Sequence, residues 1–153
     1  MQPHSQPSPA ASHFGSSYLQ ATVSSASPSR LRLMLIERAV EIATSLSDDY
    51  RTGAASGETE SSMRLFDILS ELLSGVTGST DSRENQTCDQ VADLYVFLIQ
   101  HLIAAEKISD STAVTEIAAV LQVEAETWRM VCATETEQST RTASGGAGLN
   151  FTA

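Results

Sequence analysis

The sequence predicts an all-α protein, an antiparallel up-and-down four-helix bundle. In each of four segments, apolar residues recur in steps of three, four and seven, which is the spacing of one face of a helix. No segment alternates apolar and polar residues over a useful length, which argues against strands. Short stretches of glycine and small polar residues separate the segments, and short connections place consecutive helices antiparallel.

The 153 residues suffice for one domain, which we expect to be a bundle over residues 27–134. Residues 1–26 are low in hydrophobicity and contain three prolines, so we expect a flexible N-terminal tail. Tyr18 and Val23 are apolar anchors within this polar run. Residues 135–153 turn polar and then glycine-rich, and we expect a disordered C-terminal tail there.

The first two helices have clear start and stop signals. Ser27-Pro28 suits a helix start, and the apolar face that follows is Leu31, Met34, Leu35, Ile42 and Leu46. A loop with two glycines is predicted over 48–57. The second helix is predicted from about 60 to Gly75, since glycine is common just beyond a helix end. Its apolar face is Leu65, Phe66, Leu69, Leu72 and Leu73.

The third predicted helix, about 84–107, is apolar around most of its circumference. One stripe is Val91, Leu94, Tyr95, Leu98, Leu102 and Ala105, and a second is Ala92, Val96, Ile99 and Ile103. A surface helix needs only one such stripe, so this helix is either central or partly exposed as a groove. The fourth helix is predicted from cap residues at 110–112 to about 133, with Trp128 on its apolar face.

Composition excludes several function classes. The net charge of −10 disfavours binding to nucleic-acid phosphates and to anionic lipid surfaces. No run approaches the ~20 apolar residues of a membrane span, and the N-terminus lacks the features of a secretory signal, so we expect a cytoplasmic protein. Cys88 and Cys132 are too few for a disulfide framework.

The search for catalytic or metal-binding residues finds little. His101 has no Glu-x-x-His partner, and acid pairs such as Glu37/Glu41 are more typical of a solvated helix face. The glycine run at 145–148 precedes no helix, so it lacks the helix N-terminus of a phosphate site. We therefore expect no enzyme, no cofactor, no metal and no small-molecule substrate. The apolar surplus on the third helix and the anchored N-terminal tail favour a protein that holds a partner helix in a hydrophobic groove.

Several features follow one another in order along the chain: Tyr18, Val23, Ser27-Pro28, Leu31, Met34-Leu35, Ile68-Leu69-Ser70-Glu71-Leu72, Leu94-Tyr95, Leu98-Ile99, Leu102, Ala105 and Trp128. In this order they resemble the flagellin-specific flagellar secretion chaperones, the FliS family, over about 18–133. The chain departs from the family pattern at Arg38, where a glycine is usual, and at Glu106, where an asparagine is usual.

The resemblance implies an export chaperone of the bacterial cytosol. Such a chaperone binds the disordered C-terminal segment of flagellin, prevents premature polymerisation and assists delivery to the flagellar type III export apparatus. A component of the export gate is a further candidate partner. An alternative is a helical adaptor or regulator that binds another amphipathic helix; a bundle enzyme or metal protein is disfavoured by the missing ligands.

We expect the partner-binding groove to involve Tyr18, Val23, Leu31, Met34, Leu35, Tyr95, Leu98, Ile99 and Leu102. Core and groove share one composition, so the sequence leaves open which of these are ordinary core residues. A further hypothesis is that Tyr18 and Val23 cap the empty groove and are displaced by flagellin. The C-terminal tip with Leu149 and Phe151 is either a docking segment or a disordered end.

Overall fold

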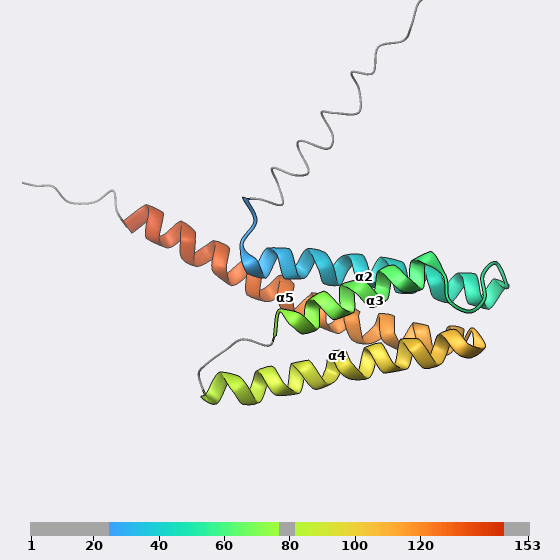
Figure 1. Ribbon diagram of the computed structural model, residues 1–153. Coiled ribbons are helices and arrows are strands. Elements are labelled where there is room, and N and C mark those ends of the chain that lie inside the picture. The colour runs from blue at the N-terminus through green and yellow to red at the C-terminus, as the bar shows by residue number, and fades with distance from the viewer. Residues whose placement is uncertain (1–24, 77–81, 146–153) are drawn as a thin grey trace, which may run out of the picture.

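The described part of the chain, residues 25–76 and 82–145 of a computed structural model, is a bundle of four helices. They are α2 (Pro28–Thr52), α3 (Glu60–Ser74), α4 (Ser82–Ile108) and α5 (Ser111–Gly145). The helices run alternately in opposite directions, and α2 and α4 each pack against both α3 and α5 (Figure 1). The predicted all-α up-and-down bundle is therefore confirmed. Among the described residues, no helix has both the length and the apolar character needed to cross a membrane.

Local signals fix where the first two helices begin. The Ser27 side chain accepts a hydrogen bond from the backbone N–H of Arg30, and Pro28 occupies the first helical position, as the sequence predicted. Thr59 and Ser62 form a reciprocal capping box at the start of α3. These contacts satisfy backbone donors that a helix start leaves without partners.

The helix α2 extends further than predicted. The loop expected over 48–57 begins only at Gly53, because Tyr50 continues the buried face of α2 by another turn. Gly53 has a φ of 74°, a left-handed conformation that glycine adopts without strain, and its N–H bonds to the carbonyl of Tyr50. The helix therefore continues to Thr52, five residues into the segment that was predicted to be a loop.

The helix α5 is also longer than the sequence predicted. Its predicted end near Ala133 was wrong, because residues 134–144 contain no glycine or proline and continue the helix to Gly145. Hydroxyl groups along this stretch, among them those of Thr136 and Thr140, donate to carbonyls one turn earlier. Residues 135–145 of the predicted tail are thus helical, whereas residues 146–153, with Leu149 and Phe151, lie outside the described residues.

The core runs along the inner faces of all four helices. Its fully buried large side chains include Ile36, Leu46, Leu65, Leu69, Leu72, Tyr95, Leu98, Leu102, Ile117 and Leu121. On α2 the predicted face was misplaced at its start, since Leu33 and Ile36 are buried and Met34 is exposed. The buried stripe of α2 continues through the small residues Ala39 and Ala43, which the sequence analysis gave too little weight.

Polar contacts close one end of the bundle. The Tyr50 hydroxyl donates to the carbonyl of Gly57, and the N–H of Gly57 donates to Ser109 Oγ at 2.8 Å. Nearby, Ser47 Oγ donates to the carbonyl of Ser111 at 2.9 Å. These bonds join α2, the loop before α3, and the turn between α4 and α5. We call this region, defined by Tyr50, Gly57 and Ser109, the closed end.

Candidate partner-binding site

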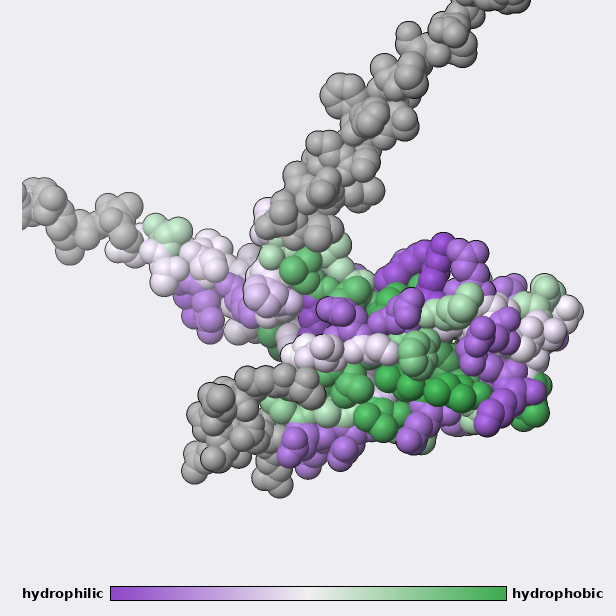
Figure 2. Space-filling view, viewed as in Figure 1, coloured by the Kyte–Doolittle hydropathy of each residue, from purple (hydrophilic) through white to green (hydrophobic). Residues whose placement is uncertain are grey.

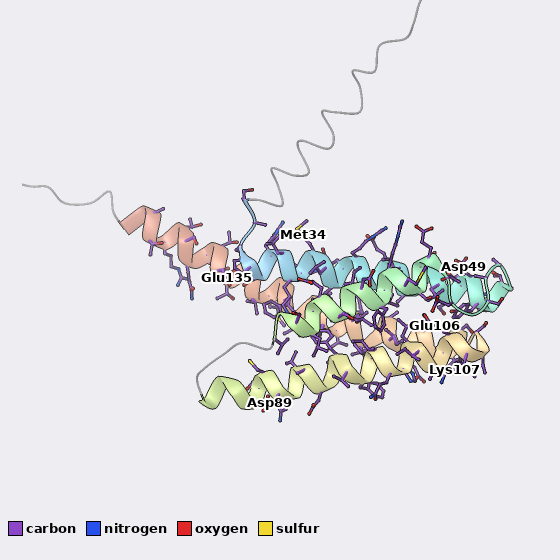
Figure 3. All side chains as sticks on the ribbon, in the orientation of Figure 1. Met34, Asp49, Asp89, Glu106, Lys107 and Glu135 are labelled. Atoms are coloured by element: carbon purple, nitrogen blue, oxygen red, sulfur yellow. The ribbon has the colours of Figure 1, made fainter. Side chains whose placement is uncertain are left out.

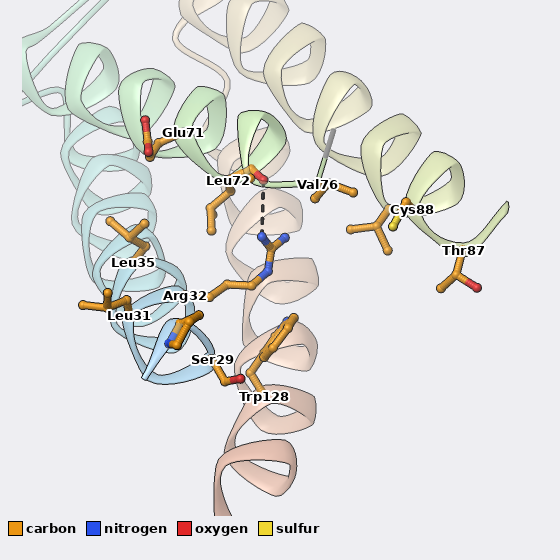
Figure 4. A pocket seen from close by; sticks show the side chains of 13 residues that line it. Ser29, Leu31, Arg32, Leu35, Glu71, Leu72, Val76, Thr87, Cys88 and Trp128 are labelled. Atoms are coloured by element: carbon orange, nitrogen blue, oxygen red, sulfur yellow. Dashed lines mark hydrogen bonds between the residues drawn. The ribbon is translucent and has the colours of Figure 1, made fainter. Parts of the chain in front are cut away.

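The other end of the bundle contains a cavity of about 650 Å³, which we call the end cavity. It lies where the start of α2, the end of α3, the first turns of α4 and the middle of α5 meet (Figure 4). Most of its lining is apolar and includes Leu31, Leu35, Leu72, Val76, Val91 and Trp128. Its size and lining are typical of a binding pocket.

Among the described residues that line the end cavity, one side chain is cationic. Arg32 extends from α2 so that its guanidinium lies between the carbonyl of Leu72 and the ring of Trp128 (Figure 4). Its carbon Cζ is 5.1 Å from the Trp128 ring centre and 5.3 Å from the Tyr95 ring centre, which are cation–π distances. Arg32 Nη1 also donates to the carbonyl of Leu72 at 3.4 Å, near the C-terminus of α3.

A hydrogen-bonded chain continues from Arg32 into the core. Arg32 Nη2 donates to the Tyr95 hydroxyl at 2.9 Å, and that hydroxyl lies 2.7 Å from both carboxylate oxygens of Glu124. Burial and the bond to Glu124 raise the pKa of Tyr95 well above its usual value, so the phenol stays protonated and donates. Burial also raises the pKa of Glu124, opposed by the Tyr95 hydrogen bond and the Arg32 charge. Arg32, Tyr95 and Glu124 thus link α2, α4 and α5 beneath the cavity.

A second apolar surface lies on the outside of α3 and α4. Met63 and Phe66 on α3, and Val96 and Ile103 on α4, are exposed at between 39% and 48% of their surface. We call these four residues the α3–α4 strip. Figure 2 shows apolar side chains gathered on the face that these two neighbouring helices present. Exposed apolar surface of this kind marks sites of protein interaction.

A comparison with protein families identifies the chain. The family described as "Flagellar protein FliS" matches residues 10–135, which include most of the described bundle. This chain belongs to the FliS family. It is therefore a flagellar chaperone, and the resemblance predicted from the sequence is confirmed. FliS is a family of chaperones and not of enzymes. No curated protein and no solved structure matches the chain.

The structure distributes the predicted groove residues of this FliS-family protein over several environments. Leu31 and Leu35 line the end cavity, and Ile99 is half-buried against the core. Met34 lies on the outer face of α2, away from the cavity (Figure 3), and contributes to a separate hollow with Glu37 and Arg129. Tyr18 and Val23 lie outside the described residues.

Three predicted groove residues belong to the core instead. Tyr95, Leu98 and Leu102 have no exposed surface, because they occupy the inner stripe of α4 that packs into the bundle. These three residues contribute to the core of the structure, which is one of the two alternatives that the sequence left open. The second stripe of α4 is exposed at Val96 and Ile103, and Phe97 and Ile108, which belong to neither stripe, are also exposed.

Sequence reasoning missed Arg32 and Glu124. A signal was present, because each charge lies in register with a buried stripe. Arg32 comes four residues before Ile36, and Glu124 three residues after Leu121. Two opposite charges on apolar stripes of different helices indicate a buried polar network.

The remaining candidates from the sequence occupy ordinary surface or rim positions. His101 Nε2 lies 2.8 Å from a carboxylate oxygen of Glu116 on α5, and its ring stacks on Phe97. Arg38, a departure from the family pattern, pairs with Glu41 at 2.8 Å on the exposed face of α2. Within the described residues, no group of three or more His, Cys, Asp and Glu side chains suits a metal ion.

Proposed function

We propose that this FliS-family chain is an export chaperone of the bacterial cytosol for flagellin. In this proposal it binds the disordered C-terminal segment of flagellin, prevents premature polymerisation, and assists delivery to the flagellar type III export apparatus. A component of the export gate would contact the loaded complex. The family supports the chaperone role, and the end cavity between α2, α3, α4 and α5 is the observation that carries the proposed binding.

The two apolar surfaces suit a partner that folds as it binds. A disordered segment can place a bulky side chain in the end cavity and lay an amphipathic helix along the α3–α4 strip. Ordering such a segment costs roughly 2–5 kcal/mol, which burial of apolar surface has to offset. Leu31 and Leu35, which line the cavity, and Ile99, half-buried on α4, are the predicted groove residues that keep this role in the proposal.

In this proposal, the N-terminal residues compete with flagellin for the apolar surface of the chaperone. Tyr18 and Val23 would occupy the apolar surface of the empty chaperone and leave when flagellin binds. Deleting residues 1–26 is then expected to tighten binding or to speed it. Unchanged affinity together with an unchanged association rate would count against this role of the tail.

Calorimetric titration tests the proposal. The full-length protein is titrated with the C-terminal segment of flagellin from the same genome, at several temperatures. We expect one-to-one binding and a negative heat-capacity change, which is the mark of apolar burial. The absence of binding at micromolar concentration, with both components intact, would refute the flagellin proposal and move the function to the adaptor alternative.

A further inference from the structure

The guanidinium of Arg32 has donors that its protein contacts do not use. One contact, to the carbonyl of Leu72, is long at 3.4 Å, and the other is the 2.9 Å bond to the Tyr95 hydroxyl. An arginine carries more N–H donors than these two bonds require. Arg32 Nε is buried and has no acceptor among the described residues. A buried donor without an acceptor costs stability, so the contacts within the protein leave the hydrogen-bonding capacity of Arg32 partly unmet.

The charge of Arg32 is also incompletely balanced. In the described part of the chain, no carboxylate lies within ion-pair distance of its guanidinium, and Glu124 is reached only through the Tyr95 hydroxyl. Glu71 also lines the cavity but is exposed to solvent, where its charge is screened. In a chain of net charge −10, the inner wall of this cavity is therefore a local cationic site.

The guanidinium is already oriented for recognition. The rings of Tyr95 and Trp128, and the end of α3 at Leu72, hold it from three other helices. Little side-chain entropy would then be lost when a partner binds, which is the advantage of a preorganised site.

We infer that the end cavity selects a partner segment with a carboxylate side chain beside a bulky apolar residue, and that Arg32 is the residue that reads the carboxylate. The apolar residue would fill the space lined by Leu35, Val91 and Trp128, while the carboxylate accepts charge-assisted hydrogen bonds from Arg32. This inference rests on the proposed function, in which the segment is the C-terminal part of flagellin.

Selectivity for a carboxylate would distinguish the flagellin segment from the chain's own N-terminal residues. Residues 1–24 contain no aspartate or glutamate, so in the proposed competition they would offer no carboxylate to Arg32. A flagellin segment with both groups gains a contact that the tail lacks. The carboxylate would thus help an incoming partner to displace the chain's own N-terminal residues.

A double-mutant cycle tests the inference. Each Asp and Glu of the flagellin segment is replaced in turn by Asn or Gln, and binding to the wild-type protein and to Arg32→Gln is measured calorimetrically. We expect one replacement to weaken binding to the wild type about tenfold, and to have less than about a twofold effect on Arg32→Gln. Arg30→Gln, an exposed position on the same helix, is the matched control and should respond as the wild type does.

Each outcome discriminates. Equal effects of every replacement on the wild type and on Arg32→Gln would overturn the role of Arg32 and leave the flagellin proposal standing. No binding of the unmodified segment to the wild type would instead refute the proposed function itself. Circular dichroism tests whether Arg32→Gln is folded. If it is not, Arg32→Lys is used, which keeps the charge but loses the planar fork, and a replacement effect as large as in the wild type would contradict the inference.

Discussion

The two ends of this bundle are built from the same four helices but differ in how completely they are packed and hydrogen-bonded. At the closed end, the Tyr50 hydroxyl donates to the Gly57 carbonyl, and the Gly57 N–H donates to the Ser109 hydroxyl. At the other end, the four helices leave a cavity of about 650 Å³, and Arg32 Nε is buried without an acceptor among the described residues. A cavity and an unsatisfied donor both reduce stability, so the second end is the less stable one.

The difference indicates where a chaperone of this kind can leave packing and hydrogen bonding incomplete without losing its fold. Closure at one end keeps the helices in register, as the hydrogen bond between the loop before α3 and the turn after α4 indicates. The incomplete end then retains apolar surface and unused hydrogen-bonding capacity for a partner. The following predictions test this contrast, in order of their expected effect on the free energy of unfolding.

The largest contrast is expected from one substitution made at two places on α2. Leu46 is fully buried toward the closed end, whereas Leu35 is half-buried and lines the end cavity. Leu46→Ala should lower the free energy of unfolding by about 2–5 kcal/mol, because it leaves a new void in a packed core. Leu35→Ala should cost less, roughly 1 kcal/mol, because it removes fewer packed atoms. Urea unfolding of the two variants measures both values.

The loss of binding affinity should be larger for Leu35→Ala than for Leu46→Ala, which is the opposite of their order in loss of stability. Leu35→Ala should weaken binding of the flagellin C-terminal segment, whereas Leu46→Ala should leave it nearly unchanged under conditions where the variant is folded. Equal losses of stability at the two positions would show that the two ends are packed alike and would contradict the contrast.

A second contrast compares the two buried tyrosines. Tyr50→Phe removes one hydrogen bond, to the Gly57 carbonyl, and should cost about 1 kcal/mol. Tyr95→Phe separates Arg32 from Glu124 and leaves both charged groups with one partner fewer, which should cost about 1–3 kcal/mol. Thermal and urea unfolding of the two variants decide the order. A smaller loss for Tyr95→Phe would mean that the polar network contributes little to the fold.

Filling the end cavity should separate stability from binding. Val91→Phe adds apolar volume to the cavity wall and should change the free energy of unfolding by no more than about 1 kcal/mol, since there is space for the ring. It should nevertheless weaken binding of the flagellin segment at least about tenfold, because it occupies the space that the partner needs. Val123→Phe, at an exposed position on α5, is the matched control. Unchanged binding by Val91→Phe would exclude the end cavity as the binding site.

The fold was largely predictable because helix signals are local. The cap at Ser27-Pro28 and the apolar spacing along α3 and α4 identified helices without knowledge of their neighbours. The errors arose where local signals are weak. The polar stretch after Ala133 lacks an apolar face, yet it contains no helix breaker before Gly145, and so the helix continues.

The site was less predictable because burial depends on how the helices are rotated against one another. Both apolar stripes of α4 have the same apolar character. In the structure, however, Tyr95 and Leu98 on one stripe lie in the core, whereas Val96 on the other stripe is exposed. The end cavity depends on where α3 ends relative to α4. The Arg32–Glu124 network was visible only as two charges on apolar stripes, and its geometry required the packed bundle.

The smallest effect expected is a change in how stability depends on pH at Glu124. Burial raises the pKa of its carboxyl above the ordinary value of 4.5, so the folded state holds this proton more tightly than the unfolded state does. The stability that protonation contributes is fully present below the unfolded pKa and is lost as the pH rises through the folded pKa. Glu124→Gln, which cannot ionise, lacks this loss. The free energy of unfolding of Glu124→Gln, relative to the wild type, should therefore increase between pH 4.5 and pH 7.

Urea unfolding at a series of pH values measures this difference, with Glu126→Gln as the control. Glu126 lies on the same helix but is exposed, and its contact with Gln122 is long at 3.4 Å. A difference for Glu124→Gln that shrinks as the pH rises would mean that Arg32 and Tyr95 stabilise the ionised carboxylate more than burial opposes it. The charge of Arg32 would then already be balanced within the protein, and the end cavity would have less to offer a carboxylate from a partner.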